Sequence, residues 1–350
     1  MSGRVRVHPA ELSGYAKQLE RNGDSAIDMW RYADGYMDFS ALSTGGLINL
    51  VLEGHKHAYS AGRSICQYTH TLLHASSQEL TKAAHWYRST DEAAAERIDH
   101  LNVGVPRPPG RQPGDLTGRA HGRYTDLADP RHGLNGATSL DLTDPSQPIS
   151  TVLDLISPAA WAFGLVEAIT GRNIPGEVAQ EFVGDWEAWS KAGSVWEQLG
   201  QAFAELGHNV AQGNADMDPG WDGVAADAAY EYFGGLADDL GAQQETFNAL
   251  HSGYEFYARF SYTVAAVISD LIKSLFDILL ELTASGGAAG EVIAALQTPR
   301  IIHICDKISK LISAAKTAGG AVNAFIIFHS EMLISLRRPL PQHAYDLNGV

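Results

Sequence analysis

The sequence predicts an all-α protein, an elongated bundle of two antiparallel long-helix hairpins with additional apolar helices toward the C-terminus. Apolar residues recur at steps of three and four along both hairpins, segments rich in Gly and Pro separate the helices, and no segment is rich in β-forming residues. With 350 residues, 45% of them hydrophobic, the chain can bury a sizeable core.

The first hairpin is expected within residues 1–100. A loop near Met37 to Gly46, with Asp, Ser, Thr and paired Gly, separates its two helices. The second helix has the clearer periodicity, a spacing that keeps one seam against a partner helix. The seam residues are Val51, Ala58, Gly62, Ile65, Thr69, Leu72, Ser76, Leu80, Ala83 and, at its end, Tyr87.

Residues 101–148 differ sharply in composition from the hairpin before them. They contain PRPPG, QPGD, ADPRHG and DPSQP. Because proline lacks a backbone donor and disfavours helix in the residue before it, no long helix can run through this segment. We predict a linker between two modules.

The second hairpin is expected within residues 149–260. A short helix at 151–169, broken by Pro158, precedes a long helix from Glu177. The turn NADMDPGWDG follows, where Asp218 and Pro219 are suited to begin the returning helix as cap and first-turn proline. The two seams are Phe182, Trp189, Trp196, Leu199, Phe203, Leu206 and Val210, then Ala229, Leu236, Leu240, Gln243, Phe247, Leu250, Tyr254 and Tyr257.

Residues 261–336 are expected to form apolar helices separated at TASGGAAGE and TPR, followed by a tail at 337–350. The stretch 262–282 carries its charges on one helical stripe, which predicts an amphipathic helix rather than a membrane span. The run 321–336 contains His329 and Glu331, which favours a buried or interfacial helix. The stripe consists of Asp270, Lys273, Asp277 and Glu281.

The net charge and the N-terminal sequence limit which functions and which export routes the protein can have. A net charge of -16 argues against nucleic-acid binding, which needs a basic surface. The N-terminus lacks the apolar core and cleavage site of a secretory signal, so export from the cytoplasm requires another signal. Whether Cys66 and Cys305 form a disulfide is left open, because the sequence does not give their separation.

The sequence contains little that predicts a metal site or catalysis. Cys66, His70 and His74 share one helical stripe, but a further zinc ligand at short spacing is missing, so polar seam positions are the expectation. No G-x-S-x-G, P-loop, HExxH or paired-cysteine motif occurs. We predict no enzyme activity, no metal and no cofactor.

Two motifs stand at the ends of the predicted seams. Trp221 and Gly223 form a WxG triplet in the turn of the second hairpin, where the ring can cover the open end and glycine tolerates a positive φ. Tyr87 and Asp91 form a YxxxD element whose spacing places phenol and carboxylate on one helical face. Each motif also has a purely structural interpretation. Tyr87 can be a seam tyrosine with the Asp91 carboxylate on the surface nearby, and Trp221 can simply cap the hairpin.

The second hairpin resembles the WXG superfamily of type VII (ESX) secretion substrates over roughly 150–285. The YxxxD element resembles the export signal of PE, EspC-like and EspB-like proteins. EspB-like proteins carry both hairpins in one chain in this order, whereas a PE and PPE pair divides them between two chains. The present chain departs from EspB in its long Pro-rich linker and its apolar helical C-terminal part.

The resemblance implies that the hairpins pack side by side and that Tyr87, Asp91, Trp221 and Gly223 meet at one end. There they would form a composite secretion signal for the pathway's membrane ATPase or a chaperone. A small WXG partner or a homo-oligomer is a further implied partner. The expected location is extracellular or in the cell envelope, reached without a signal peptide.

Three functions are compatible with the sequence. The first is a non-catalytic type VII cargo or secreted scaffold. The alternative is a membrane-active or pore-forming effector that contacts membrane through 260–336. The third is a cytosolic helical toxin or an unrecognised enzyme.

Overall fold

A computed structural model describes residues 6–39, 45–90, 124–138, 144–157, 162–284 and 288–336. The predicted all-α class is confirmed, because long helices carry almost all of this part of the chain. The helices are α1 (Pro9–Met37), α2 (Gly46–Asn49), α3 (Leu52–Ser89), α5 (Ser146–Ile156), α6 (Phe163–Thr170), α7 (Ile174–Phe182), α8 (Trp186–Met217), α9 (Val224–Ala284) and α10 (Ala288–Leu336).

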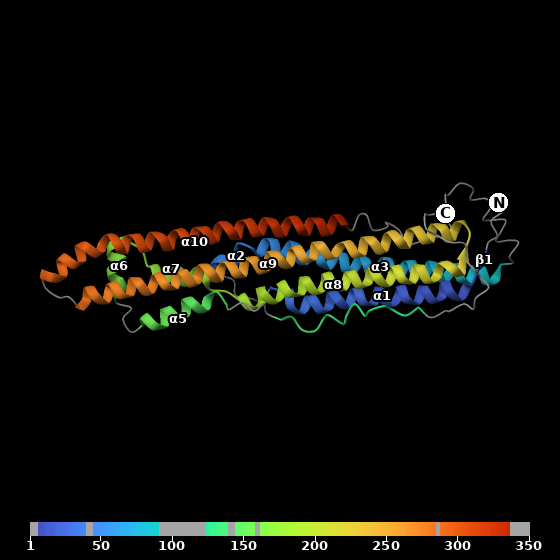
Figure 1. The fold of residues 1–350 in the computed structure, drawn as a ribbon, viewed down its shortest axis with the longest axis horizontal. Coiled ribbons are helices and arrows are strands. Elements are labelled where there is room, and N and C mark those ends of the chain that lie inside the picture. Colours follow the sequence, from blue (N-terminus) through green and yellow to red (C-terminus); the bar gives the residue numbers. More distant parts are fainter. Residues whose placement is uncertain are drawn as a thin grey trace.

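Four helices form the bundle. α1 pairs with α3, α8 pairs with α9, and the two hairpins meet where α1 packs on α8. α10 folds back along α9 and also packs against α3. The result is an elongated rod, with α9 along most of its length and the short helices α5, α6 and α7 gathered near the end opposite β1 (Figure 1).

The three predicted seams line the core. All their members are buried except Tyr87 at the end of the α3 seam, which is half-buried. The α8 and α9 seams meet through aromatic rings, as where Trp189 stacks on Tyr254 with centroids 4.1 Å apart. The periodicity therefore identified the buried face of each helix correctly.

The turn between α8 and α9 differs from the prediction. Asp218 and Pro219 do not begin the returning helix; they lie in a 3-10 turn, Asp218–Gly220, followed by the short strand β2 (Trp221–Asp222). β2 pairs antiparallel with β1 (Arg6–Val7), so α9 begins only at Val224. The backbone groups of this turn are satisfied by a strand from the N-terminus, which local sequence does not reveal.

Three predicted helix boundaries were wrong. The long helix expected from Glu177 is interrupted at Val183, whose extended backbone separates α7 from α8. α9 runs without a break through residue 260, and α10 continues through Pro299. Proline removes one backbone hydrogen bond from a helix, and the packing of α10 on α9 and α3 offsets that loss.

Part of the predicted linker packs on the bundle. In residues 124–138 the ring of Tyr124 is buried, and Arg21 Nη2 of α1 donates to the Tyr124 carbonyl oxygen over 2.6 Å. From α8, Asn209 Nδ2 donates to the Ala128 carbonyl oxygen over 2.9 Å. Side chains of two helices thus supply the partners that an extended backbone needs. The division of the chain into five segments stays a prediction.

The structure also answers the expectations for the charged stripe on α9 and for the two cysteines. Asp270, Lys273, Asp277 and Glu281 are all exposed on α9, as predicted for an amphipathic helix. Cys66 and Cys305 are both free thiols in buried positions, so the open question of a disulfide is answered in the negative.

Candidate functional site

The tip of the rod where α8 turns into α9 holds three of the predicted site residues, Tyr87, Trp221 and Gly223. The rings of Tyr87 and Trp221 meet edge to face, with centroids 6.0 Å apart and planes at 76°. Trp86 packs against Tyr87 with ring centroids 4.8 Å apart. The structure therefore brings the end of the first hairpin onto the turn of the second.

Trp221 is held by the backbone around it. Val7 of β1 lies opposite Trp221, and the His8 amide donates to the Gly220 carbonyl oxygen over 2.7 Å. The Trp221 side chain is 1% exposed, so it closes the tip from inside. A large apolar ring in this position gains most of its stabilisation from burial.

Gly223 provides the change of direction after Trp221. Its φ of 124° lies in the region that L side chains rarely adopt. The next helix starts immediately, with the Asp227 amide donating to the Gly223 carbonyl oxygen over 2.9 Å. A side chain at this position would strain the turn, which explains the WxG spacing physically.

Contacts from α1 and from residues 124–138 support the tip, and sequence reasoning missed them. Arg88 Nη2 donates to Ser13 Oγ over 3.0 Å, which ties the end of α3 to the start of α1. Tyr124 Oη donates to the buried Glu11 Oε2 over 2.8 Å. Burial, followed by this hydrogen bond, raises the pKa of the Tyr124 phenol. The phenol thus stays protonated and acts as a hydrogen-bond donor.

Asp91, the fourth predicted site residue, lies outside the described residues. Its role and its distance from Tyr87 stay predictions. Sequence pattern indicated Tyr87, Trp221 and Gly223, whereas Glu11, Ser13 and Tyr124 carried no recognisable signal because their partners are distant in the chain.

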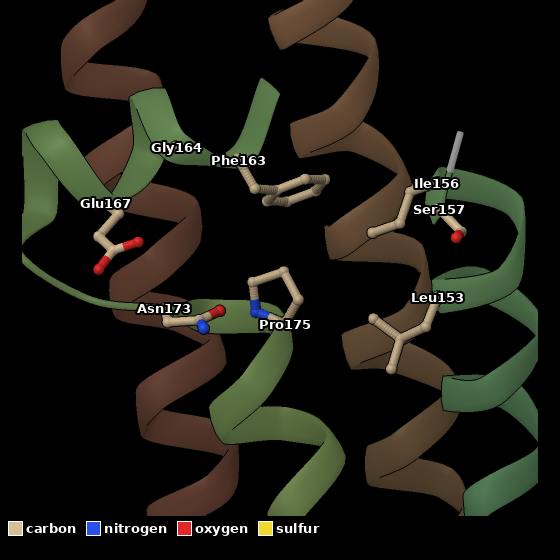
Figure 2. Close-up of a pocket in the computed structure, with 8 residues that line it drawn as sticks. All are labelled: Leu153, Ile156, Ser157, Phe163, Gly164, Glu167, Asn173 and Pro175. Atoms are coloured by element: carbon tan, nitrogen blue, oxygen red, sulfur yellow. The ribbon is translucent and has the colours of Figure 1, made fainter. Parts of the chain in front are cut away.

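A pocket lies toward the opposite end of the rod. It has a volume of about 470 Å³ and lies among α5, α6 and α7 (Figure 2). Glu167 is the one ionisable side chain among its lining residues, which leaves it without a second acid or base. The lining consists of Leu153, Ile156, Ser157, Phe163, Gly164, Glu167, Asn173 and Pro175.

The stripe Cys66, His70 and His74 is divided by the fold. Cys66 is buried in the core, and burial raises the pKa of its thiol, which disfavours the thiolate that binds metals. His70 and His74 instead face Asp24 of α1, and one potential ligand atom from each of the three lies within 4.8 Å of the others. Asp24 was not predicted, since only packing of α1 on α3 brings it there.

A comparison with known families matches the first part of the chain. Residues 1–100 match the family described as "Excreted virulence factor EspC, type VII ESX diderm". These residues include α1 and α3, and Tyr87 in the last turn of α3 packs against Trp221 of the WxG turn. The match supports a type VII secretion substrate. No curated protein and no solved structure matches the chain.

Proposed function

We propose that this chain is a non-catalytic cargo or secreted scaffold of the type VII pathway, exported through a composite signal made of Tyr87, Asp91, Trp221 and Gly223. The observation that carries the proposal is the edge-to-face contact of Tyr87 with Trp221, at the end of a region that matches a type VII family. In this proposal both motifs act together at one end of the bundle, in an EspB-like single-chain arrangement.

The half-buried position of Tyr87 suits a signal of this kind. Its ring is anchored by Trp86 and Trp221, while the side chain keeps part of its surface open to a partner. Aromatic anchors held in a fixed orientation lose little conformational entropy when a partner binds. The partner in this proposal is the pathway's membrane ATPase or a chaperone, with a small WXG protein or a second copy of the chain as a further partner.

An export assay in a strain with an intact type VII system tests the signal. Tyr87→Ala and Asp91→Ala should each reduce the secreted fraction to background, because each removes one side chain that the partner reads. Tyr68→Ala is the matched control, since Tyr68 is also a half-buried tyrosine on α3.

The folded state of each variant is checked by circular dichroism of purified protein. Export of Tyr87→Ala and Asp91→Ala at the level of the unaltered chain, with their helical content intact, would show that the motif is no signal. Equal loss in Tyr68→Ala would assign the effect to general destabilisation.

A specific observation favours a second candidate, a membrane-active effector. Among the described residues one helical stretch, Ala295–Ser335, is long and apolar enough to cross a membrane, and 28% of its most apolar window is buried. Phe328 of α10 is 61% exposed, although it is a large apolar side chain. Exposed apolar residues on one helix are typical of surfaces that meet protein or lipid.

Flotation and dye release with anionic liposomes separate this candidate from a soluble scaffold. A membrane-active chain should float and release dye, Phe328→Ser should weaken both, and Leu127→Ser should change neither. Leu127 is the control because it is 65% exposed but lies outside α10. A full-length chain that neither floats nor releases dye would exclude membrane activity under these conditions.

A further inference from the structure

Asp24, His70 and His74 form a cluster where α1 and α3 lie side by side, and His74 precedes Tyr87 by 13 residues on α3. His70 and His74 are four residues apart on α3, which places both imidazoles on one helical face. Their ring centroids are 4.4 Å apart, and His74 Nε2 lies 2.9 Å from Asp24 Oδ1. Two imidazoles and one carboxylate therefore converge from two helices.

The hydrogen bond of His70 fixes which nitrogen is free. His70 Nδ1 lies 2.9 Å from the Gly23 carbonyl oxygen. Because a carbonyl oxygen only accepts, Nδ1 carries the proton, and Nε2 of the neutral ring keeps its lone pair. A backbone carbonyl bound to the second nitrogen is the arrangement that orients metal-binding histidines in proteins.

Gly23 permits the close approach of the two helices here. A Cβ atom at this position would lie 2.6 Å from His74 Cδ2 and 3.3 Å from the His70 carbonyl oxygen. The first contact is too short and the second is tight, so a larger residue would force the His74 imidazole or α1 to move. The sequence at Gly23 and Asp24 thus supplies both the space for the imidazole and a carboxylate beside it.

We propose that Asp24, His70 and His74 bind a divalent transition-metal ion, with zinc as the representative ion. Imidazole and carboxylate together suit Zn²⁺ and its neighbours in the first transition row. Tetrahedral coordination at 2.0–2.1 Å places ligand atoms roughly 3.3 Å apart. The His74 to Asp24 contact of 2.9 Å would open slightly, and the ligand atom of His70, which lies within 4.8 Å of the other two, would move toward them. Binding requires the proton on His74 Nε2 to move to Nδ1 or to solvent, and it leaves the fourth position to water.

The physical consequence is a clamp between the two helices of the first hairpin. The metal would bridge α1 to α3 and stabilise the folded hairpin, since an ion that binds only the folded state adds its binding free energy. His74 is 28% exposed and Asp24 is 59% exposed, so an ion can reach the cluster from solvent without unfolding. This inference does not depend on the export proposal.

The test is calorimetric titration of tag-free, full-length protein with Zn²⁺ near neutral pH, supported by the visible spectrum of the Co²⁺ form. One Zn²⁺ should bind per chain and raise Tm. Asp24→Asn, His70→Gln and His74→Gln should each weaken Zn²⁺ binding by at least about tenfold, because each removes one of three ligands.

His57→Gln is the matched control. His57 is an exposed histidine of the same helix, with Glu53 Oε1 3.5 Å from its Nε2. This variant should bind Zn²⁺ as the unaltered chain does. Asp24→Asn should keep the helical spectrum of the unaltered chain because Asp24 is exposed, yet lose the Zn²⁺-dependent rise in Tm.

Two results would overturn the proposal. One is the absence of saturable Zn²⁺ or Co²⁺ binding up to millimolar metal. The other is binding that all three ligand variants retain at unchanged affinity, which would place the metal elsewhere on the chain. Neither result depends on export measurements, so the metal site and the export signal are tested independently of each other.

Discussion

The two hairpins of the bundle differ in the side chains that they bury. The α8 and α9 hairpin buries eight aromatic rings, whereas the α1 and α3 hairpin buries two, Tyr15 and Trp30. The eight are Trp186, Trp189, Trp196, Phe203, Phe233, Phe247, Tyr254 and Tyr257. Both hairpins also bury polar side chains, which in the first are Glu11, Gln18, Asn22, Ser25, His55, Thr69, Ser76 and Ser77.

The polar groups of the first hairpin reach across to the second. Asn209 Nδ2 donates to Asn22 Oδ1 over 2.9 Å, and Tyr15 Oη donates to the Val210 carbonyl oxygen over 3.0 Å. Apolar burial supplies most of the free energy of folding, while hydrogen bonds between buried groups select one alignment. We infer that the second hairpin provides the stable core and that the first is positioned on it by hydrogen bonds.

The largest expected effect comes from removing an aromatic ring of the second hairpin. Trp189 is fully buried, stacks on Tyr254 and donates from Nε1 to the Tyr254 carbonyl oxygen over 3.1 Å. Trp189→Ala should lower the free energy of unfolding by about 3–5 kcal/mol, because it leaves a large cavity. Guanidinium denaturation measures this loss.

Trp189→Phe, which keeps most of the ring volume, should cost less than the alanine variant. Ser76→Ala, a change in the α3 seam, is the comparison. If Trp189→Ala lowers the free energy of unfolding no more than Ser76→Ala does, the second hairpin is not the more stable core. Ser76 Oγ makes one hydrogen bond, to Tyr232 Oη at 3.0 Å, so its removal should cost about 1 kcal/mol.

The next effect concerns pH and the contact between α3 and α9. His55 Nε2 lies 2.8 Å from the Met37 carbonyl oxygen and therefore donates to it, while His55 Nδ1 accepts from Tyr254 Oη at 2.6 Å. Burial lowers the pKa of His55 from 6.5 to about 4 in the folded protein. The charged form would lose the bond from Tyr254 and lie unsolvated in the core.

The unfolded chain binds this proton at higher pH than the folded chain does. Stability from neutral His55 is therefore complete above pH 6.5 and is lost as pH falls from there to about 4. The loss amounts to about 3 kcal/mol, since each pKa unit corresponds to about 1.4 kcal/mol. Denaturation at several pH values should show this slope, and His55→Gln should flatten it. An unchanged slope in that variant would place the acid sensitivity elsewhere.

A smaller effect is expected from the hydrogen bonds that align the hairpins. Asn209 of α8 is fully buried; Nδ2 donates to Asn22 and to the Ala128 carbonyl oxygen, and Oδ1 accepts from the Leu127 amide over 2.8 Å. Asn209→Ala should cost about 1–3 kcal/mol, because it leaves buried groups without partners. Thermal unfolding measures the loss.

Gln212→Ala is the control for Asn209→Ala, since Gln212 bonds Asp216 on the exposed face of the same helix. Hydrogen exchange should also show faster exchange in α1 of the Asn209 variant than in α9. Uniform exchange across both hairpins would mean that they unfold as one unit and that no separate alignment step exists.

The sequence by itself determined the helices and their buried faces. Burial in a long helix repeats with the helical period, so the α3, α8 and α9 seams, including Trp189 and Tyr254, could be read directly. It also placed Tyr87 and the WxG turn at the ends of those seams. Boundaries were less predictable: Pro299 did not end α10, because packing on α9 and α3 offsets one lost hydrogen bond.

Only the tertiary structure decided which distant residues meet. The contact of Tyr87 with Trp221, the docking of Tyr124 on Glu11 and the meeting of Asp24 with two histidines depend on how far each helix slides along its neighbour. Periodicity fixes the face that a helix buries, but a shift by one turn leaves that face unchanged. Side-chain volumes and buried hydrogen bonds select the alignment, and they act only once the helices are packed.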